Sequence, residues 1–257
     1  MALTYGTIHG DYGDEKVTST TADTGNTIGT RMILPDGRVF RYSFSNGAVG
    51  AGTGVQSSAA VANHDSDLAV ASAAAVGDKS VSITLGSTDA AEDLYANGYL
   101  FVNDSGTSGT GEGHVYRIRQ HNAVDVSDST AMTINLMDGD TIAEALVAGQ
   151  SQVGLVANPY MHVIPSPGGA QTGRTIGFAP CEVADNTYFW AQTWGESAVL
   201  ADGTLVIFRP LRMSDNVAGA VEEYSSQTDA EEQVVGYATN VLAADTEYQF
   251  AFLTISP

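Results

Sequence analysis

The richest aromatic stretch of the chain is Tyr188-Phe189-Trp190-Ala191-Gln192-Thr193-Trp194. Aromatic and β-branched residues favour strands, and successive side chains of a strand point to opposite faces. On such a strand Trp190 and Trp194 share one face, and Phe189 lies on the other. We expect one face to lie in the core and the other at a contact between subunits. The alternative is a sugar-binding platform, because aromatic rings stack on sugars.

Strand patterns also dominate outside this stretch. Polar and apolar residues alternate, and turn residues such as Leu34-Pro35-Asp36-Gly37 separate the runs. Two further runs flank the glycine-rich segment 106–113 and predict a β-hairpin with a long tip. The sequence therefore predicts a mainly β fold of sandwich-like or barrel-like units. The strands that we expect are 38–44, 79–85, 99–102, 114–119, 131–136 and 204–208.

Few segments indicate a helix. Thr141 and Glu144 form a capping box, and Gly149 is placed to end a short helix over 141–149. A different signal is the similarity between Ile176-Gly177-Phe178-Ala179 and Val235-Gly236-Tyr237-Ala238. Each of these segments precedes a polar turn and an aromatic run, which indicates two equivalent hairpins. Chance similarity is the alternative.

Shifts in composition divide the chain into three regions. Residues 1–55 are rich in Thr, Gly and Asp and hold one clear strand, so we expect an extended N-terminal arm that covers a neighbour. Residues 56–169 are expected to form a middle β domain that ends in a Pro- and Gly-rich linker. Residues 170–257 are expected to form a C-terminal β domain, and they contain both tryptophans.

The charge of the chain limits its partners. There are 10 Lys and Arg against 30 Asp and Glu, which gives a formal net charge of -20. Binding to nucleic acid or to an anionic membrane depends on Lys and Arg near phosphates, so we expect neither partner. Met1–Tyr5 has no basic region and no long apolar run, and we expect no secretion signal there.

No pattern of residues points to catalysis, a cofactor or a metal. The glycine-rich segment 106–113 lacks the Gly-Lys-Ser/Thr ending of a phosphate loop, and no Gly-x-Ser-x-Gly motif occurs. The histidines lack metal-binding spacings, and the acidic segments 11–15 and 63–67 are interpreted as solvated loops, with calcium binding left open. The single cysteine, Cys181, is expected to be a small buried residue. We therefore expect a protein that is not an enzyme and that has no cofactor.

The stretches 97–104, 188–195, 199–206, 219–222 and 234–238 belong to one pattern in the sequence. With these stretches, the chain resembles virion structural proteins of tailed bacteriophages, in particular capsid decoration (cement) proteins. The resemblance is a diffuse pattern over residues 80–257, without a catalytic motif. It implies a β-rich fold, assembly as a homotrimer, and binding at junctions of a capsid lattice.

The resemblance leads to a functional hypothesis. We expect a non-enzymatic decoration protein on the outer surface of a phage capsid, with the major capsid protein and further copies of itself as partners. The arm at residues 1–55 is expected to clamp neighbouring capsid subunits. The alternative is a phage head-fibre, spike or tail protein that binds a host receptor or glycan. The residues expected at subunit or capsid contacts are Tyr5, Tyr12, Phe40, Tyr42, Trp190 and Trp194.

Overall fold

The fold is mainly β and comprises two compact units, described here separately. A computed structural model describes residues 6–23, 25–104, 111–225, 232–241 and 245–257. Unit 1 consists of residues 1–59 and 159–257, and unit 2 consists of residues 60–158. Unit 2 is therefore an insertion in the chain of unit 1. No helix in the described ranges is long and apolar enough to cross a membrane.

Unit 1 contains an 11-stranded sheet with the main order β1-β2-β3-β13-β17-β16-β14-β15. Strands β4, β11 and β12 branch from this path, because β12 pairs with both β13 and β4, and β4 pairs with β11. The strands of unit 1 are β1 (Thr7–His9), β2 (Arg31–Ile33), β3 (Val39–Phe44), β4 (Gly54–Gln56), β11 (Ile164–Pro165), β12 (Thr175–Phe178), β13 (Tyr188–Leu200), β14 (Pro210–Met213), β15 (Val221–Glu223), β16 (Gly236–Ala238) and β17 (Tyr248–Thr254). A 3-10 turn, η1, covers Asp14–Lys16.

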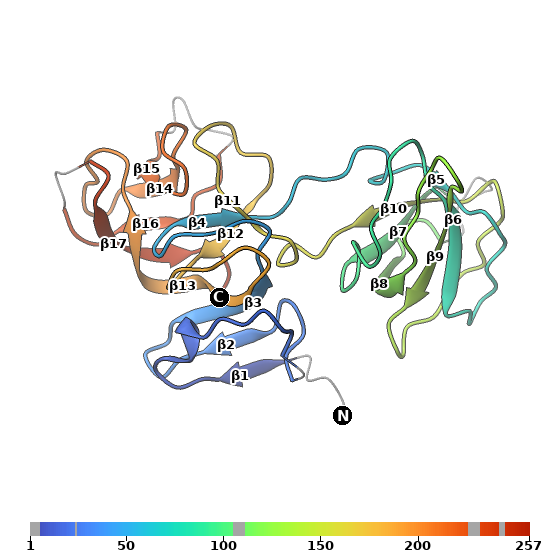
Figure 1. The fold of residues 1–257 in the computed structure, drawn as a ribbon, viewed down its shortest axis with the longest axis horizontal. Coiled ribbons are helices and arrows are strands. Elements are labelled where there is room, and N and C mark those ends of the chain that lie inside the picture. The colour runs from blue at the N-terminus through green and yellow to red at the C-terminus, as the bar shows by residue number, and fades with distance from the viewer. Residues whose placement is uncertain (1–5, 24, 105–110, 226–231, 242–244) are drawn as a thin grey trace. The chain divides into compact units, whose positions relative to one another are not determined.

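Strand β13, which contains the aromatic stretch, pairs with strands from both the N-terminal and the C-terminal parts of the chain. Its first half pairs with β3, from Tyr188 opposite Phe44 to Trp194 opposite Val39. Its second half pairs with β17, from Trp194 opposite Thr254 to Leu200 opposite Tyr248. Figure 1 shows the blue strand β3 beside the orange strand β13. The aromatic stretch therefore forms the expected strand, and three apolar clusters of unit 1 surround it.

The extended N-terminal arm expected from the sequence is not seen. Strands β1 to β4 of this region belong to the sheet of unit 1, and Met32 and Phe40 are fully buried there. The physical reason is that the alternating strand Val39–Phe44 needs a partner for its backbone groups and cover for its apolar face. The first and third regions expected from the sequence thus fold together. The middle region corresponds to unit 2, with its limits at 60–158 in place of 56–169.

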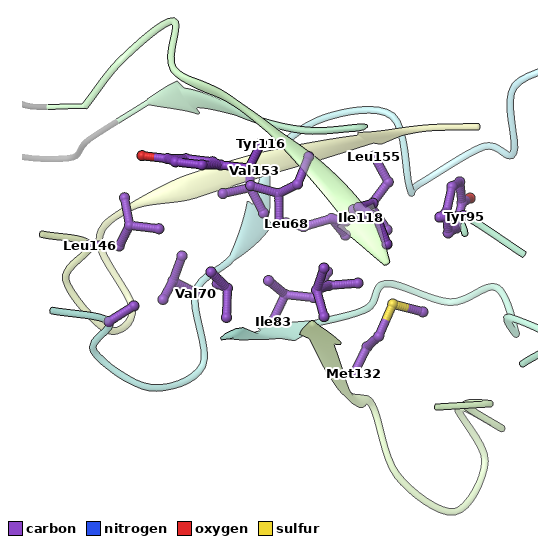
Figure 2. Close-up of a cluster of buried hydrophobic side chains, with 14 of the residues drawn as sticks. Leu68, Val70, Ile83, Tyr95, Tyr116, Ile118, Met132, Leu146, Val153 and Leu155 are labelled. Carbon is purple, nitrogen blue, oxygen red and sulfur yellow. The ribbon is translucent and has the colours of Figure 1, made fainter. Parts of the chain in front are cut away.

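Unit 2 is a six-stranded sheet that nearly closes on itself. Its strand order is β5-β10-β7-β8-β9-β6, and a bridge between Val70 and Ile83 joins the two outer strands. Alternate side chains of each strand point into one apolar core (Figure 2), as in a small barrel. The strands are β5 (Leu68–Ala69), β6 (Ser80–Thr84), β7 (Tyr99–Asp104), β8 (Val115–His121), β9 (Ala131–Leu136) and β10 (Gln152–Val156).

Several local predictions can be compared with unit 2. The strand predicted at 131–136 is confirmed, and so is the hairpin, in which Tyr99 pairs with Arg117. Its tip at 105–110 lies outside the described residues. The helix predicted over 141–149 is wrong. The backbone of this segment is irregular, and Leu146 and Ala74 exchange two backbone hydrogen bonds. This conformation places the side chain of Leu146 in the core of unit 2.

We predict that residues 60–158 fold when expressed alone, because unit 2 has its own core and a nearly closed sheet. Ile118→Ala should then lower the free energy of unfolding of this fragment by about 2–5 kcal/mol, since Ile118 is fully buried. Val115→Ala on the same strand is the control and should change it by less than about 0.5 kcal/mol, since Val115 is exposed. Urea unfolding measures both variants, and a fragment without a cooperative transition would contradict the prediction.

Candidate interaction surface

An aromatic surface covers the outer side of three neighbouring strands in unit 1. We call it the apolar face and define it by Trp194 on β13, Tyr237 on β16, and Tyr248, Phe250 and Phe252 on β17. Tyr237 lies opposite Phe252, and Phe252 lies opposite Glu196 of β13, next to Trp194 in the register. These pairings bring side chains from three strands onto one continuous surface.

The exposure of the apolar face follows from the alternation along β17. Gln249, Ala251 and Leu253 are buried on the inner side, so the residues between them point outward. Tyr248 is 55% and Phe250 is 51% exposed. A sheet with one solvated side normally carries polar residues on that side. A group of exposed aromatic residues there is typical of an interaction site.

A carboxylate lies within the apolar face. The ring of Trp194 meets the ring of Phe252 edge-on, with centroids 5.5 Å apart. Glu196 lies directly opposite Phe252 in the register, and its Oε2 accepts a hydrogen bond from the Thr239 hydroxyl at 3.2 Å. The surface therefore combines aromatic rings with a fixed hydrogen-bonding acidic group.

An exposed turn at Val206–Arg209 borders the apolar face. Arg209 N donates to Val206 O at 3.0 Å, and Phe208 N donates to Ala238 O at 2.9 Å, which places the turn beside Tyr237. Phe208 is 80% exposed and has a φ of 66°. The strand predicted at 204–208 is wrong, because only Leu205 of its apolar residues reaches the core and the chain turns immediately after it.

The contact residues expected from the sequence lie in different environments. Tyr5 falls outside the described residues, and Tyr12 is exposed. Phe40, Tyr42 and Trp190 are buried in one cluster of unit 1, so they offer no surface to a partner in this fold. The ring of Tyr42 lies 5.0 Å from that of Trp190.

Of the predicted residues in the aromatic stretch, Trp194 lies on the apolar face and Trp190 lies in the core. The shared face predicted for them is interrupted by an irregularity between Gln192 and Trp194, where β13 carries one residue more than β3. The sequence analysis missed Tyr237, Tyr248 and Phe250. The aromatic residues at the alternate positions 248, 250 and 252 were the signal that could have identified part of this face.

Cys181 is only half-buried, in contrast to the expectation from the sequence. Its Sγ lies 3.6 Å from Lys16 O, and its side chain packs against the cluster around Phe189. Burial, together with the nearby negative charge of Glu182, raises the pKa of the thiol. The protonated thiol is thus favoured over the reactive thiolate.

Unit 2 carries a separate polar cleft of about 270 Å³. Neither Lys nor Arg lines it, so its electrostatics disfavour an anionic ligand. In the part of the chain that the structure describes, no three His, Cys, Asp or Glu residues are grouped to hold a metal ion. The lining residues are Glu92, Asp93, Gln120, His121, Asn122, Thr133 and Asn135.

A buried polar chain supports the wall of this cleft. Tyr95 N donates to His121 Nε2 at 3.0 Å, and the Tyr95 hydroxyl lies 2.7 Å from His64 Nδ1. Because His64 Nε2 faces the carbonyl oxygen of Thr88 at 2.9 Å, it must donate, and in the neutral imidazole Nδ1 then accepts a hydrogen bond from the Tyr95 hydroxyl. Each of these groups has a structural partner, so we interpret the chain as a support for the fold.

Comparison with protein-family models, with curated proteins and with solved structures finds no match for this chain. The functional argument therefore rests on the two surfaces described above. Of these, the apolar face is the one whose exposure is unfavourable for an isolated chain.

We predict that the two tryptophans differ in their accessibility to acrylamide. Trp190 is 6% exposed, whereas Trp194 is partly exposed at the apolar face. Trp194→Phe should therefore remove most of the quenchable fluorescence, and Trp190→Phe should leave it. Stern–Volmer plots of the two variants measure the difference, and stronger quenching of Trp190 would contradict this description of the face.

We predict that alkaline pH destabilises unit 2 through Tyr95. Burial, and secondarily the charge of Asp65, raise the pKa of Tyr95 above its ordinary value of 10.0. Above pH 10 the unfolded tyrosine loses its proton while the folded one keeps it, so the stability contribution is present below pH 10 and is lost as pH rises toward the folded pKa.

The measurement is urea unfolding of the 60–158 fragment from pH 8 to the alkaline limit. Tyr95→Phe should flatten the decrease above pH 10. At pH 8 it should cost about 1–3 kcal/mol, because His64 Nδ1 loses its donor. An identical alkaline slope in both proteins would exclude Tyr95 as its source.

Proposed function

We propose that this chain is a non-enzymatic capsid decoration protein that binds the outer surface of a tailed-phage head and stabilises the lattice of the major capsid protein. Homotrimeric assembly is part of this proposal. The observation that carries it is the apolar face on a chain that is otherwise strongly acidic. The sequence resemblance supplies the class of partner, and the face supplies a surface for contact.

The size of the apolar face supports a protein partner. A fully buried aromatic side chain covers roughly 150–250 Å². Tyr237, Tyr248 and Phe250 are each about half exposed, and the turn at Val206–Arg209 adds the almost completely exposed Phe208. Together these side chains present several hundred Å² of apolar surface, which is in the range of functional patches. Aromatic residues are also enriched at the centre of protein interfaces.

The charge supports a place on the outside of a head. A net charge of -20 is unfavourable next to packaged nucleic acid and favourable for solubility before assembly. A lattice also presents many identical sites to an oligomer. Moderate contacts at each site then combine into strong overall binding, as long as the geometry lets the copies bind together.

A specific feature of the same face favours the alternative function, which is glycan or receptor binding by a head-fibre, spike or tail protein. The ring of Trp194 meets the ring of Phe252, and Glu196, whose carboxylate accepts a hydrogen bond from Thr239, lies opposite Phe252 in the register. An aromatic ring beside a fixed hydrogen-bonding group is the arrangement that stacks on a sugar and orients its hydroxyls. A glycan would thus occupy part of the surface assigned above to the capsid.

The test is co-sedimentation of the purified chain with heads assembled from the major capsid protein encoded in the same genome. We expect saturable binding, and we expect Phe250→Asp to weaken it at least tenfold, since a charge in the centre of the face would be desolvated without a partner. Val115→Asp is the matched control, because Val115 is 58% exposed on unit 2 and Phe250 is 51% exposed.

Two results would contradict the proposal. Wild-type protein that does not bind heads excludes the decoration function. Equal binding of the Phe250→Asp variant and the wild type excludes the apolar face as the binding surface. Quenching of Trp194 fluorescence by soluble oligosaccharides, without head binding, would instead support the alternative.

A further inference from the structure

We propose that the turn Val206–Arg209 is the anchor of this interface and that Phe208 inserts into an apolar pocket, rimmed by Lys or Arg, on the partner protein. This inference rests on the proposed function, because it names the part of the surface that contributes most to binding and the chemistry of the site that receives it. The partner is the outer surface of the assembled major capsid protein.

The backbone of the turn is unfavourable for a phenylalanine. Phe208 has a φ of 66°, in the left-handed region that glycine adopts freely and that bulky side chains avoid. It occupies the second central position of a turn closed by Arg209 N donating to Val206 O. Glycine or asparagine normally fills such a position when φ is positive. A strained residue held in this way is a reason to look for a function.

The strain is not compensated by packing within unit 1. Phe208 is 80% exposed, more than any other large apolar residue described, and its neighbours Val206 and Ile207 are about 40% exposed. Three successive apolar side chains therefore face solvent at the tip of one turn. Exposed aromatic side chains of this kind act as interface hot spots when a pocket on the partner desolvates them.

The surrounding structure holds the turn in place. Val206 N donates to Glu223 Oε1 at 2.7 Å on one side, and Phe208 N donates to Ala238 O on the other. Leu205, directly before the turn, is fully buried. The turn is thus fixed before binding, so little conformational entropy would be lost when Phe208 enters a pocket.

The charges around the anchor select a basic rim on the partner. Glu196 lies within the apolar face, and Glu223 contacts the base of the turn. Of the two basic residues from 175 to 257, Arg212 is engaged by Asp215 and Glu222, whereas Arg209 is exposed in the turn itself. One positive charge therefore stands against the carboxylates of Glu196 and Glu223 around the anchor. A second copy of this chain would bring the same excess of negative charge, whereas Lys or Arg around a pocket would complement it.

The available area agrees with a protein partner. An interface of standard size buries about 800 Å² on each partner. The apolar face alone, with its aromatic residues half exposed, offers several hundred Å². The turn, which is continuous with the face beside Tyr237, raises this area toward that of a standard interface and places its most exposed residue at one end.

The decisive variant is Phe208→Gly, measured for head binding and for thermal unfolding. Glycine removes the ring and relieves the strained φ at the same time. We expect head binding to weaken at least tenfold while the melting temperature stays unchanged or rises. Phe208→Trp keeps an aromatic anchor and should retain binding. Val76→Gly is the control, because it removes a 64% exposed apolar side chain from a loop of unit 2.

The outcomes separate this inference from the proposed function. If wild type and Phe208→Gly bind heads equally, the anchor is wrong and the decoration function stands. If wild type fails to bind, both are wrong. A melting temperature several degrees lower in Phe208→Gly would show that Phe208 stabilises the free chain and would overturn the argument.

Two further measurements test the partner chemistry. Wild-type binding should weaken as NaCl is raised, and binding that does not depend on salt would overturn the basic rim. Light scattering tests whether a second copy of this chain, and not the capsid protein, covers the turn. Wild-type oligomers that dissociate in Phe208→Gly would show that a second copy covers the turn and would overturn the assignment to the capsid.

Discussion

The fold of unit 1 depends on satisfying the backbone of one long strand, β13. Its 13 residues carry N–H and C=O groups on both edges, and each buried group needs a partner. Strand β3 from the N-terminal segment supplies partners for the first half, and β17 from the C-terminal segment supplies them for the second half. Because β13 recruits both ends of the chain, the first 59 residues cannot behave as an independent arm.

The same pairing requirement explains where unit 2 can be inserted. The chain leaves unit 1 just after β4 and returns just before β11, and these two strands pair antiparallel, with Gln56 opposite Ile164. The ends of the insertion are therefore adjacent in unit 1, whatever the chain between them does. An inserted domain is tolerated at such a position, because the host fold needs only that the two ends meet. Unit 2 in turn gains its stability from its own core and from the bridge between Val70 and Ile83.

Strands are predicted best from the sequence where one face of the strand is buried and the other is exposed to solvent. The segments 80–84 and 131–136 alternate in this way, and both are strands. The sequence predicts poorly where tertiary contacts override local preference. The helix former Leu146 enters the core of unit 2 from an irregular segment, and the run 204–208 turns after Leu205.

Local sequence patterns could not predict the whole candidate surface, because its residues are far apart in the sequence. Trp194 was identified from its neighbours along the chain, but an irregularity in β13 separates its environment from that of Trp190. Tyr237 and Phe252 meet only through the pairing of β16 with β17, and Phe208 joins them through a hydrogen bond to Ala238. The fold brings these distant segments together, so periodicity within one segment reveals only the part of the surface that lies on β17.

Strong acidity and an exposed aromatic face are complementary properties in one chain. The face alone would favour association between copies, since burial of apolar area is not directional. A net charge of -20 opposes association of two copies through this face, because such a contact brings like charges together. A partner with basic groups around an apolar pocket removes that repulsion and gains the aromatic contacts as well. Under the proposed function, charge selects the surface that is accepted, and the aromatic side chains set how tightly it is held.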